Sequence, residues 1–509
     1  MSDCQTVVFG LDGAGFELIE PWLDAGELPN VKQAVETGIS GDLRSVMPPV
    51  TSPNWKTYAT GKNPGKIGIY WWENVNVEER RVYYPTERKS VNTEFWEIIG
   101  EEDSAGVIGV PTTYPPKSID GFLVAGAPDG SNEGFARPPE LEKRLREEFG
   151  YRVLKRNRLA DDIDAAAAEI HDLIDLRFTV AKRLFEEWDV PFLQVTTFYL
   201  NSLHHFLWDH EYTLEGWKIV DEHLGAFLDE GYDIVLMSDH GSNEVQTVFH
   251  INTWLERRGH LRTETGVADI LYEFGINADR LLRLATHARL DGVAKRLAPD
   301  WLLNYVPNEA GEIERNGKEG SVDWDASEAI ASGQGPIYLT VNEDSPRYEE
   351  LQTELIDALM ALTDPAGRPV AVAVHRGEEI YDGPYIDDAP DLVIEQAPGV
   401  HIPGNVGRGE VFSDPRDDGW RAENKREGLF VATGPSFATG TVEGLSIMDL
   451  APTLLHLHDC AVPDDMDGVV RQDVFAPGSE PAERSVALRS TGTATEEERI
   501  RRIARKLQI

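Results

Sequence analysis

The hydrophobic pattern of the chain alternates between short apolar runs and longer amphipathic stretches. The first apolar run, "TVVFGL" at residues 6–11, is rich in β-branched and aromatic residues and ends in Asp12 and Gly13. Its length and composition predict a buried strand with an acidic side chain at its C-terminal tip. Runs of the same kind are found at 105–114, 191–201 and 232–241.

Helical patterns separate these apolar runs. The clearest is "DAAAAEIHDLIDLRFTVAKRLFEEW" at 164–188. Alternation of strand and helix predicts an α/β fold, with a mostly parallel sheet that is covered by helices on both faces. Open sheets of this kind carry their chemistry at the carboxyl ends of the strands, so Asp12 stands where a functional residue is expected.

The pattern changes after residue 261 and divides the chain into four predicted parts. Residues 1–261 form the first part of a catalytic α/β core, and residues 262–320 form an inserted helical subdomain. Residues 321–480 form the second part of the core, and residues 481–509 form a tail that ends in a helix. The insertion contains the amphipathic stretch "ADRLLRLATHARLDGVAKRLAP". Strand patterns return at 335–341, 369–374, 391–395 and 428–434. A charged helical pattern at 495–507 closes the chain.

Acidic residues dominate the charge of the 509-residue chain. Asp and Glu number 89 against 48 Lys and Arg, which gives a formal net charge of −41. The acidic residues are spread along the whole chain between periodic apolar positions, which indicates a solvated acidic surface. At ~1 M salt the Debye length falls to roughly 3 Å, so such a surface would repel itself little. We therefore expect a salt-adapted protein with neither duplex nucleic acid nor an anionic membrane as a partner.

Cysteine content and targeting signals favour the cytoplasm. The chain has two cysteines, Cys4 and Cys460, so nearby pairs cannot build a disulfide framework or a thiolate metal site. Its N-terminus lacks the pattern of a signal peptide, and no run of 18 apolar residues occurs. We expect a cytoplasmic protein, and the sequence does not indicate its oligomeric state.

Two motifs bring together residues that could bind a metal ion. "SDHG" at 238–241 places Asp239 and His240 just after a predicted strand, and Gly241 permits the turn that would let both face one ion. An Asp-His pair alone is more often a loop feature than a ligand set. Asp12, however, ends the first strand in the same way, which strengthens the case for a shared metal site.

The second motif is "PPVTSPNW" at 48–55, where prolines surround two hydroxyls in what we expect to be a rigid bend. A divalent cation lowers the pKa of an oxygen bound to it, so a Thr51 or Ser52 hydroxyl placed on that cation would become a nucleophile near neutral pH. The prolines would hold the hydroxyl in line for attack. The Asn54 amide could donate to an oxygen of the group under attack.

In order and combination, these motifs resemble the alkaline phosphatase superfamily, and most closely its type I phosphodiesterase and nucleotide pyrophosphatase family. The resemblance rests on "GLDGAG", "PPVTSPNWKTYATGKNPGKIGI", "SDHG", "EGLFVATGP" and "MDLAPTLLHL", with further similarity at 322–341, 378–395 and 462–470. It implies a three-layer α/β/α sandwich. It also implies two metal ions and transfer of a phosphoryl or nucleotidyl group through a covalent Thr or Ser intermediate.

Carried onto this sequence, the resemblance implies a first ion held by Asp12, Asp239 and His240, with Thr51 as both ligand and nucleophile. Ser52 is the alternative hydroxyl, and Asn54 falls where the family has a donor to a phosphate oxygen. Zn²⁺ is the ion we expect at this first site, with Mg²⁺ or Mn²⁺ as alternatives.

The expected ligands of the second ion depart from the family pattern. Where the family has Asp-x-x-x-His and a further His, this chain has Asn201, His205 and Asn424. Amide oxygens are weaker ligands than a carboxylate or an imidazole, so this set should hold zinc poorly. A one-metal enzyme, a site for a harder ion such as Mg²⁺ or Mn²⁺, and a non-catalytic phosphate binder all stay open. We expect the neighbouring His204 to serve packing or to face solvent.

The leading hypothesis is a metal-dependent hydrolase of phosphate esters that cleaves phosphodiester or pyrophosphate bonds through a covalent Thr51 intermediate. Its substrate would be a phosphorylated small molecule or a nucleotide-type compound. The alternative is a catalytically impaired pseudo-enzyme that binds a phosphorylated ligand or partner, and it is motivated by Asn201 and Asn424.

Overall fold

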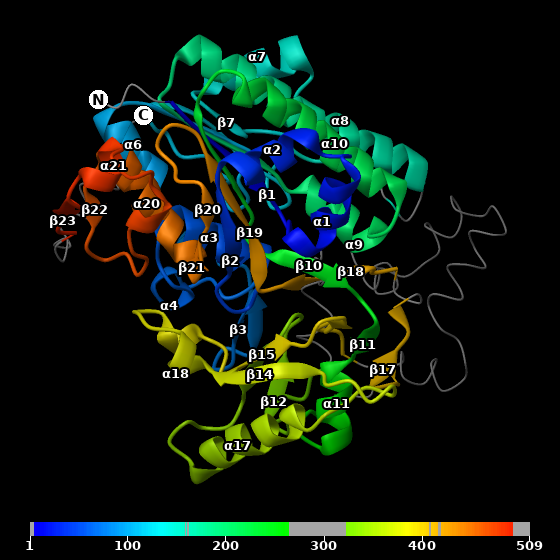
Figure 1. The fold of residues 1–509 in the computed structure, drawn as a ribbon. Helices are drawn as coiled ribbons and strands as arrows, with labels where there is room; N and C mark the ends of the chain where they lie inside the picture. The colour runs from blue at the N-terminus through cyan, green and yellow to red at the C-terminus, as the bar shows by residue number, and fades with distance from the viewer. Residues whose placement is uncertain are drawn as a thin grey trace.

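A computed structural model describes residues 5–157, 159, 162–263, 322–406, 409–415 and 419–491. Its centre is a ten-stranded sheet in which neighbouring strands follow the order β20-β2-β19-β9-β1-β8-β5-β6-β7, with β21 also paired to β2 (Figure 1). The strands are β1 (Thr6–Leu11), β2 (Ile39–Arg44), β5 (Ala105–Ile108), β6 (Gly121–Val124), β7 (Ala136–Arg137), β8 (Phe192–Thr197), β9 (Asp233–Met237), β19 (Glu427–Thr433), β20 (Gly440–Thr441) and β21 (Leu445–Ser446).

The sheet is mainly parallel, as the strand and helix alternation predicts. β1 pairs in parallel with β8 and β9, and β5 pairs in parallel with β8 and β6. β19 is antiparallel to both of its neighbours, β9 and β2. In the register between β1 and β9, Gly10 is the partner of Met237. Extending that register by two residues places Asp12 beside Asp239 at the carboxyl edge of the sheet.

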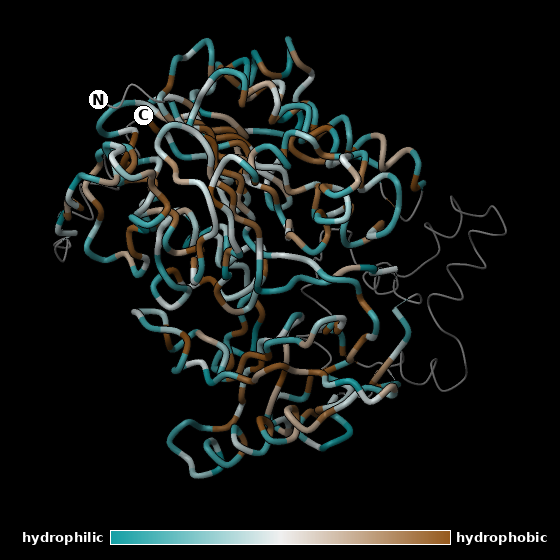
Figure 2. Tube along the Cα trace, in the orientation of Figure 1, coloured by the Kyte–Doolittle hydropathy of each residue, from teal (hydrophilic) through white to brown (hydrophobic). Residues whose placement is uncertain are grey.

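Helices cover both faces of the sheet, which confirms the three-layer architecture (Figure 1). Successive side chains of a strand point to opposite faces, and β1 shows the result. Val7, Phe9 and Leu11 belong to one buried cluster and Val8 to the other. The first cluster includes residues of α1 (Phe16–Ala25), α2 (Pro29–Thr37), α7 (Pro139–Phe149), α8 (Ile163–Trp188), α9 (Tyr199–Leu207) and α10 (Glu211–Leu228). The second includes residues of α3 (Thr51–Thr60), α6 (Phe95–Glu102) and α20 (Leu450–Leu457). Figure 2 shows the apolar strands between these two polar-faced layers.

Most of the later strands build a separate antiparallel sheet instead of extending the central one. The sheet follows the order β12-β13-β15-β14 and contains β12 (Ala329–Ala331), β13 (Pro336–Leu339), β14 (Ala371–Arg376) and β15 (Leu392–Gln396). It has its own buried cluster, which includes Leu351, Leu355 and Leu359 of α17 (Pro346–Met360) and Trp254 of α11 (Ile251–Arg258). Of the strand patterns predicted after residue 322, that at 428–434 forms β19 of the central sheet.

Shorter elements connect these layers. A two-stranded antiparallel ribbon of β10 (Gly241–Glu244) and β18 (Ala422–Lys425) lies next to the carboxyl edge of the central sheet, and β11 (Thr247–Phe249) pairs with β16 (Val400–His401) and β17 (Phe412–Ser413). The other short elements are β3 (Asn74–Asn76), β4 (Arg81–Tyr83), α4 (Pro64–Ile67), α5 (Thr86–Val91), α18 (Gly377–Ile380), α21 (Glu480–Glu483), β22 (Val462–Pro463), β23 (Leu488–Arg489) and three short 3-10 helices, η1 (Ile386–Asp388), η2 (Ile447–Asp449) and η3 (Gln472–Val474).

Two predicted elements lie outside the described residues. They are the helical insertion at 262–320, except for its first two residues, and the terminal helix at 495–507. The domain limits therefore stay predictions. Among the helices of the described residues, none combines the length and the apolar character that crossing a bilayer requires.

A buried ion pair supports the helix that begins at Thr51. Lys56 of α3 is fully buried, and its ammonium donates to Glu94 Oε1 at 2.5 Å and to the Lys89 carbonyl at 2.9 Å. Glu94 is also buried and accepts a hydrogen bond from Trp96 Nε1. Both charges are desolvated, so each depends on the other.

We expect Glu94→Gln to lower the free energy of unfolding by about 3–5 kcal/mol, because it leaves the buried Lys56 charge unpaired. Urea unfolding at constant salt measures the change. The matched control is Glu147→Gln in the exposed pair of Lys143 and Glu147, where the atoms are 3.9 Å apart and a loss of at most about 1 kcal/mol is expected. Equal losses for the two variants would contradict the importance of the buried pair.

Candidate active site

Three side chains from two neighbouring strands converge at the carboxyl edge of the sheet. Asp12 follows β1, and Asp239 and His240 follow β9. In the described part of the chain, they form the one group of three carboxylate, imidazole or thiol side chains whose ligand atoms all lie within 4.8 Å of one another. All three residues are fully buried. The structure therefore brings together the predicted ligands from positions more than two hundred residues apart.

The atoms that meet here carry lone pairs. His240 Nδ1 lies 2.9 Å from the Gly241 carbonyl, which holds the Nδ1 proton and leaves the lone pair on Nε2. His240 Nε2 in turn lies 3.2 Å from Asp239 Oδ2 and 3.8 Å from Asp12 Oδ1. Two carboxylate oxygens and an imidazole nitrogen thus face a common point. A cation at that point would compensate their repulsion, so this donor set fits a divalent metal ion.

Burial opposes the charge of every member of this group. It raises the pKa of Asp239 to about 8, and hydrogen bonds from backbone groups such as Gly13 N–H lower it in part. Burial, and secondarily the charge of Asp239, raise the pKa of Asp12 well above its ordinary value. Burial lowers the pKa of His240. Desolvation therefore favours the neutral forms of these groups until a cation is bound.

Thr51 is the first residue of helix α3, and its hydroxyl reaches the same group. Thr51 Oγ1 donates to Asp12 Oδ1 at 3.4 Å and lies 3.2 Å from His240 Nε2. The rigid bend that we expected at "PPVTSPNW" is thus confined to the residues before Thr51, because Thr51 to Asn54 already form the first turn of the helix. The first turn of a helix directs unpaired backbone N–H groups and the positive end of its dipole outward, which favours a bound anion.

Ser52 is buried beside Thr51, but within the described residues its hydroxyl has no hydrogen-bond partner. In the described structure the Ser52 hydroxyl makes no hydrogen bond to Asp12, Asp239 or His240, in contrast to Thr51. The geometry therefore favours Thr51 over Ser52 as the hydroxyl at this site.

The expectation that the Asn54 amide faces a substrate oxygen is wrong. Asn54 is fully buried, and its Nδ2 donates to the carbonyls of Pro48 and Val50, each at 3.0 Å. Its Oδ1 accepts from Val46 N–H at 2.8 Å. The amide satisfies the backbone of the segment that leads into α3, so Asn54 positions Thr51 and leaves no donor free for a ligand.

Trp55 is a site residue that the sequence interpretation missed. Its Nε1 donates to Asp12 Oδ2 at 2.8 Å, while Asp12 Oδ1 faces Thr51 and His240. Trp55 lies four residues after Thr51, so both side chains share one face of α3. This spacing was the available signal. The indole fixes the orientation of the Asp12 carboxylate and is itself fully buried.

Asn201 and His205 lie on helix α9, which follows β8, the other neighbour of β1. The Asn201 side chain makes a hydrogen bond to Asp12, so the two residues lie side by side. This bond lowers the pKa of Asp12, whereas burial raises it. Gly13, with φ +71°, lies directly against Asn201: a Cβ added to Gly13 would approach Asn201 Oδ1 to 2.4 Å. Only glycine fits this close approach.

His205 is held in one orientation. Its Nδ1 lies 2.7 Å from the Ala422 carbonyl, and its ring stacks on Trp420 with 4.1 Å between ring centroids. Burial lowers the pKa of His205 to about 4, so the ring is neutral near pH 7. Its Nε2 therefore carries a lone pair, as a metal-ligating or hydrogen-bond-accepting histidine requires.

Asn424 joins this second group through the ribbon next to the sheet. It lies on β18, where its cross-strand partner is Ser242 of β10. Ser242 Oγ donates to the Gly13 carbonyl at 2.8 Å, so the ribbon is fastened to the turn after β1. The structure thus places Asn201 against Gly13 and Asn424 opposite Ser242, while the Ala422 carbonyl of the same ribbon holds His205.

His204 is fully buried and packs against Trp217, so the expectation of a packing role is correct. Its Nε2 accepts from Trp217 Nε1 at 3.1 Å, and the two rings stack. Burial lowers the pKa of His204 to about 3, so it is a neutral core residue.

A buried carboxylate and a histidine lie on the other side of Trp420, and sequence reasoning did not single them out. Glu423 is fully buried and pairs with His401 Nδ1, while its Oε1 accepts from Gln334 Nε2 at 2.8 Å. The His401 ring stacks on Trp420, with 5.2 Å between ring centroids. These contacts hold Trp420, and through it His205, in place. They depend on four chain segments, so no local sequence signal indicated them.

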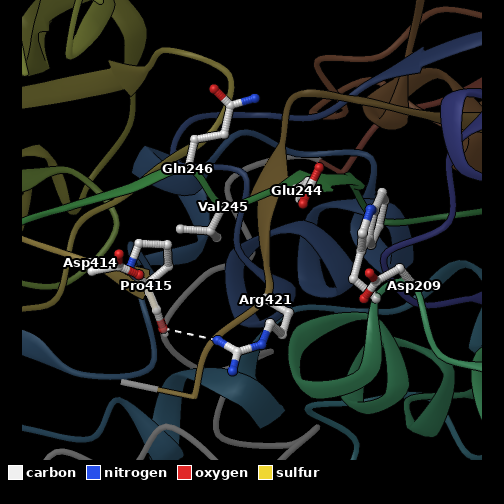
Figure 3. A pocket seen from close by; sticks show the side chains of 8 residues that line it. Asp209, Glu244, Val245, Gln246, Asp414, Pro415 and Arg421 are labelled. Atoms are coloured by element: carbon white, nitrogen blue, oxygen red, sulfur yellow. Dashed lines mark hydrogen bonds between the residues drawn. The ribbon is translucent and has the colours of Figure 1, made fainter. Parts of the chain in front are cut away.

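A surface pocket of about 320 Å³ lies at the outer ends of the same elements (Figure 3). Its lining includes Asp209, which follows α9, Glu244 at the end of β10, and Arg421, which precedes β18. Arg421 Nη1 donates to the Pro415 carbonyl at 3.0 Å, as the dashed line in Figure 3 shows. None of the predicted metal ligands lines this pocket, so it is a separate feature from the candidate site.

Comparison with known proteins agrees with the geometry. A family model described as type I phosphodiesterase / nucleotide pyrophosphatase matches residues 6–421. No curated protein sequence matches the chain. The fold is similar to crystal structures of phosphonoacetate hydrolase from Sinorhizobium meliloti 1021, in complex with phosphonoformate (TM-score 0.54) and with phosphonoacetate (TM-score 0.53). For each structure the sequence identity is 15%, and the match covers 88% of this chain and 94% of the hydrolase chain.

The raised pKa of Asp239 predicts that pH controls metal binding. In the metal-free protein, the protonated Asp239 carboxyl contributes stability that is fully present at pH values below its ordinary pKa of 3.8. This contribution is lost as the pH rises towards its raised pKa of about 8. A cation requires the ionised carboxylate, so protons compete with it over this range. The gain in Tm on adding Mn²⁺ should therefore be larger at pH 8 than at pH 5.5.

Differential scanning fluorimetry at constant salt measures these gains. Asp239→Asn, which removes the carboxylate with little change in volume, should reduce the gain at pH 8. Equal gains at both pH values in the unmodified protein would contradict competition by protons at this site.

Proposed function

Because the chain belongs to the type I phosphodiesterase / nucleotide pyrophosphatase family, whose members are phosphoester hydrolases of the alkaline phosphatase superfamily, we propose that it hydrolyses phosphodiester or pyrophosphate bonds with Thr51 as the nucleophile. The observation that carries the proposal is the placement of the Thr51 hydroxyl, at the N-terminus of a helix and within 3.4 Å of both Asp12 and His240. The substrate would be a phosphorylated small molecule or a nucleotide-type compound.

The residues at this point fit a divalent ion, which Asp12, Asp239, His240 and Thr51 would hold. Two carboxylates, an imidazole and a hydroxyl suit Zn²⁺ best, with Mn²⁺ and Mg²⁺ as alternatives. Such an ion lowers the pKa of an oxygen next to it and neutralises charge on a phosphoryl group. The buried Asp239 Oδ2, which accepts no hydrogen bond from the described residues, supports the same assignment.

The chain's own residues would then act in two steps. Thr51 Oγ1 gives up its proton and forms a bond to phosphorus while the bond from phosphorus to the leaving oxygen breaks, and that oxygen leaves with the electron pair and takes up one proton, so that the proton count is unchanged. A water molecule then attacks the phosphorus of the Thr51 ester, and the Thr51 hydroxyl is restored with one of the water protons. The backbone N–H groups of Thr51 and Ser52 would bind the phosphoryl oxygens during both steps, because Pro53 has no N–H and the Asn54 N–H donates to the Val50 carbonyl.

Substitution of the two neighbouring hydroxyls tests this assignment. Thr51→Ala should reduce hydrolysis of bis(4-nitrophenyl) phosphate by a factor of about 10³ or more, because the nucleophile is lost, while Thr51→Ser should retain part of the activity. Ser52→Ala is the matched control and should remain close to the unmodified protein. The assay is run in Mn²⁺ and in high salt, where we expect this acidic chain to be stable.

Circular dichroism and Tm establish that each variant is folded. Activity in Thr51→Ala equal to that of the unmodified protein would refute Thr51 as the nucleophile.

A second candidate is a catalytically impaired descendant that binds a phosphorylated ligand without turnover. The observation that favours it is the pair Asn201 and Asn424, which stand where the family has an aspartate and a histidine. The two candidates separate in one experiment: a phosphate analogue such as vanadate that raises Tm, together with no hydrolysis in the unmodified protein, would support binding alone.

A further inference from the structure

Asn201, His205 and Asn424 form a second group, whose side chains offer buried hydrogen-bond acceptors. Asn201 and Asn424 are at least nine-tenths buried, and the Oδ1 atom of each has no hydrogen-bond partner among the described residues. His205 adds the Nε2 lone pair, since its Nδ1 faces the Ala422 carbonyl. Three acceptor atoms are therefore present where buried acceptors are normally satisfied.

The fold directs these side chains to the same place. Asn201 and His205 are four residues apart on α9 and share one face of that helix. Ala422, which fixes His205, is two residues from Asn424 on β18, so these two residues lie on the same face of the strand. Asn201 Oδ1 lies against Gly13 and Ser242, and Ser242 is the cross-strand partner of Asn424. The three acceptors thus belong to two elements, α9 and β18, that pack against each other next to the turn that contains Gly13.

This second group carries no net charge. Asn201 and Asn424 are neutral amides, and His205, whose Nδ1 faces the Ala422 carbonyl, would offer the lone pair of a neutral imidazole. The first group, in contrast, supplies two carboxylates for one cation. A second divalent ion in a two-metal site stands about 3.5–4 Å from the first. Here it would face the repulsion of that first ion with no carboxylate among its three ligands, since the buried carboxylate next to Asn424, that of Glu423, is paired with His401.

We propose that this chain binds a single divalent ion, at Asp12, Asp239 and His240, and that the adjacent position is an uncharged acceptor site that takes a hydrogen-bond donor such as water in place of a second ion. This inference rests on the proposed function for the identity of the first site. It goes further by assigning the second position, because three neutral acceptors satisfy a donor and do not compensate a double positive charge.

Metal stoichiometry tests this inference independently of turnover. The full chain is equilibrated with excess Mn²⁺ or Zn²⁺, separated from free metal by gel filtration and analysed by inductively coupled plasma mass spectrometry. The unmodified protein should retain about one ion per chain. The variant Asn201→Asp/Asn424→His, which supplies a carboxylate and a second imidazole, should retain about two, a twofold rise.

Two controls locate the ions. Asp12→Asn in the unmodified background should remove the single ion, and Asn157→Asp, which adds one carboxylate at an exposed position, should leave the count unchanged. If the double variant does not fold, the single variants Asn201→Asp and Asn424→His, each checked by circular dichroism, replace it and should show tighter binding of a second ion than the unmodified protein.

The possible outcomes are distinct. Two tightly held ions in the unmodified protein would overturn the inference while leaving the proposed function intact. A double variant that folds but still retains one ion would overturn the role of Asn201 and Asn424. Complete absence of bound metal in the unmodified protein would remove the basis of both the inference and the metal-dependent function.

Discussion

The candidate site brings together two carboxyl groups whose ionised forms would repel each other without compensation from a described Lys or Arg. Asp12, Asp239 and His240 are fully buried, with ligand atoms within 4.8 Å of one another. Two like charges at that separation repel by on the order of 3 kcal/mol at an effective dielectric constant of about 20, in addition to the cost of their desolvation. In the described structure no Lys or Arg side chain pairs with either carboxylate. A cation at this point would offset the repulsion.

The surrounding fold holds these groups in place before any ion binds. The parallel register of β1 and β9 sets Asp12 beside Asp239. Trp55 orients one carboxylate, the Gly13 amide holds the other, and the Gly241 carbonyl fixes the imidazole. Helix α3, which carries Thr51, is tied down by Asn54 at its start and by the buried pair of Lys56 and Glu94 one turn later. Preorganisation of this kind reduces the reorganisation needed when charge develops on a phosphoryl group.

The two halves of the site differ in charge rather than in architecture. Both are built at the carboxyl edge of the sheet, around the turn that contains Gly13. The first half presents carboxylates, whereas the second presents amides on equivalent supports, with His205 fixed by Ala422 and Trp420. The second half is thus held in a defined arrangement without a carboxylate among its three side chains.

The sequence by itself indicated the α/β class, the parallel core and the candidates Asp12, Asp239 and His240, because strand periodicity and strand-end motifs are local signals. It left Thr51 beside Ser52, and only the family resemblance and the position of the Thr51 hydroxyl favour Thr51. Only the tertiary structure decided what Asn54 does, since its amide could serve either a ligand or the backbone until the path of residues 46–50 was known. The same holds for the antiparallel sheet of β12 to β15 and for the contacts of Trp420, Glu423 and His401. Such features arise from pairings between distant segments, and a strand pattern alone does not specify its partner.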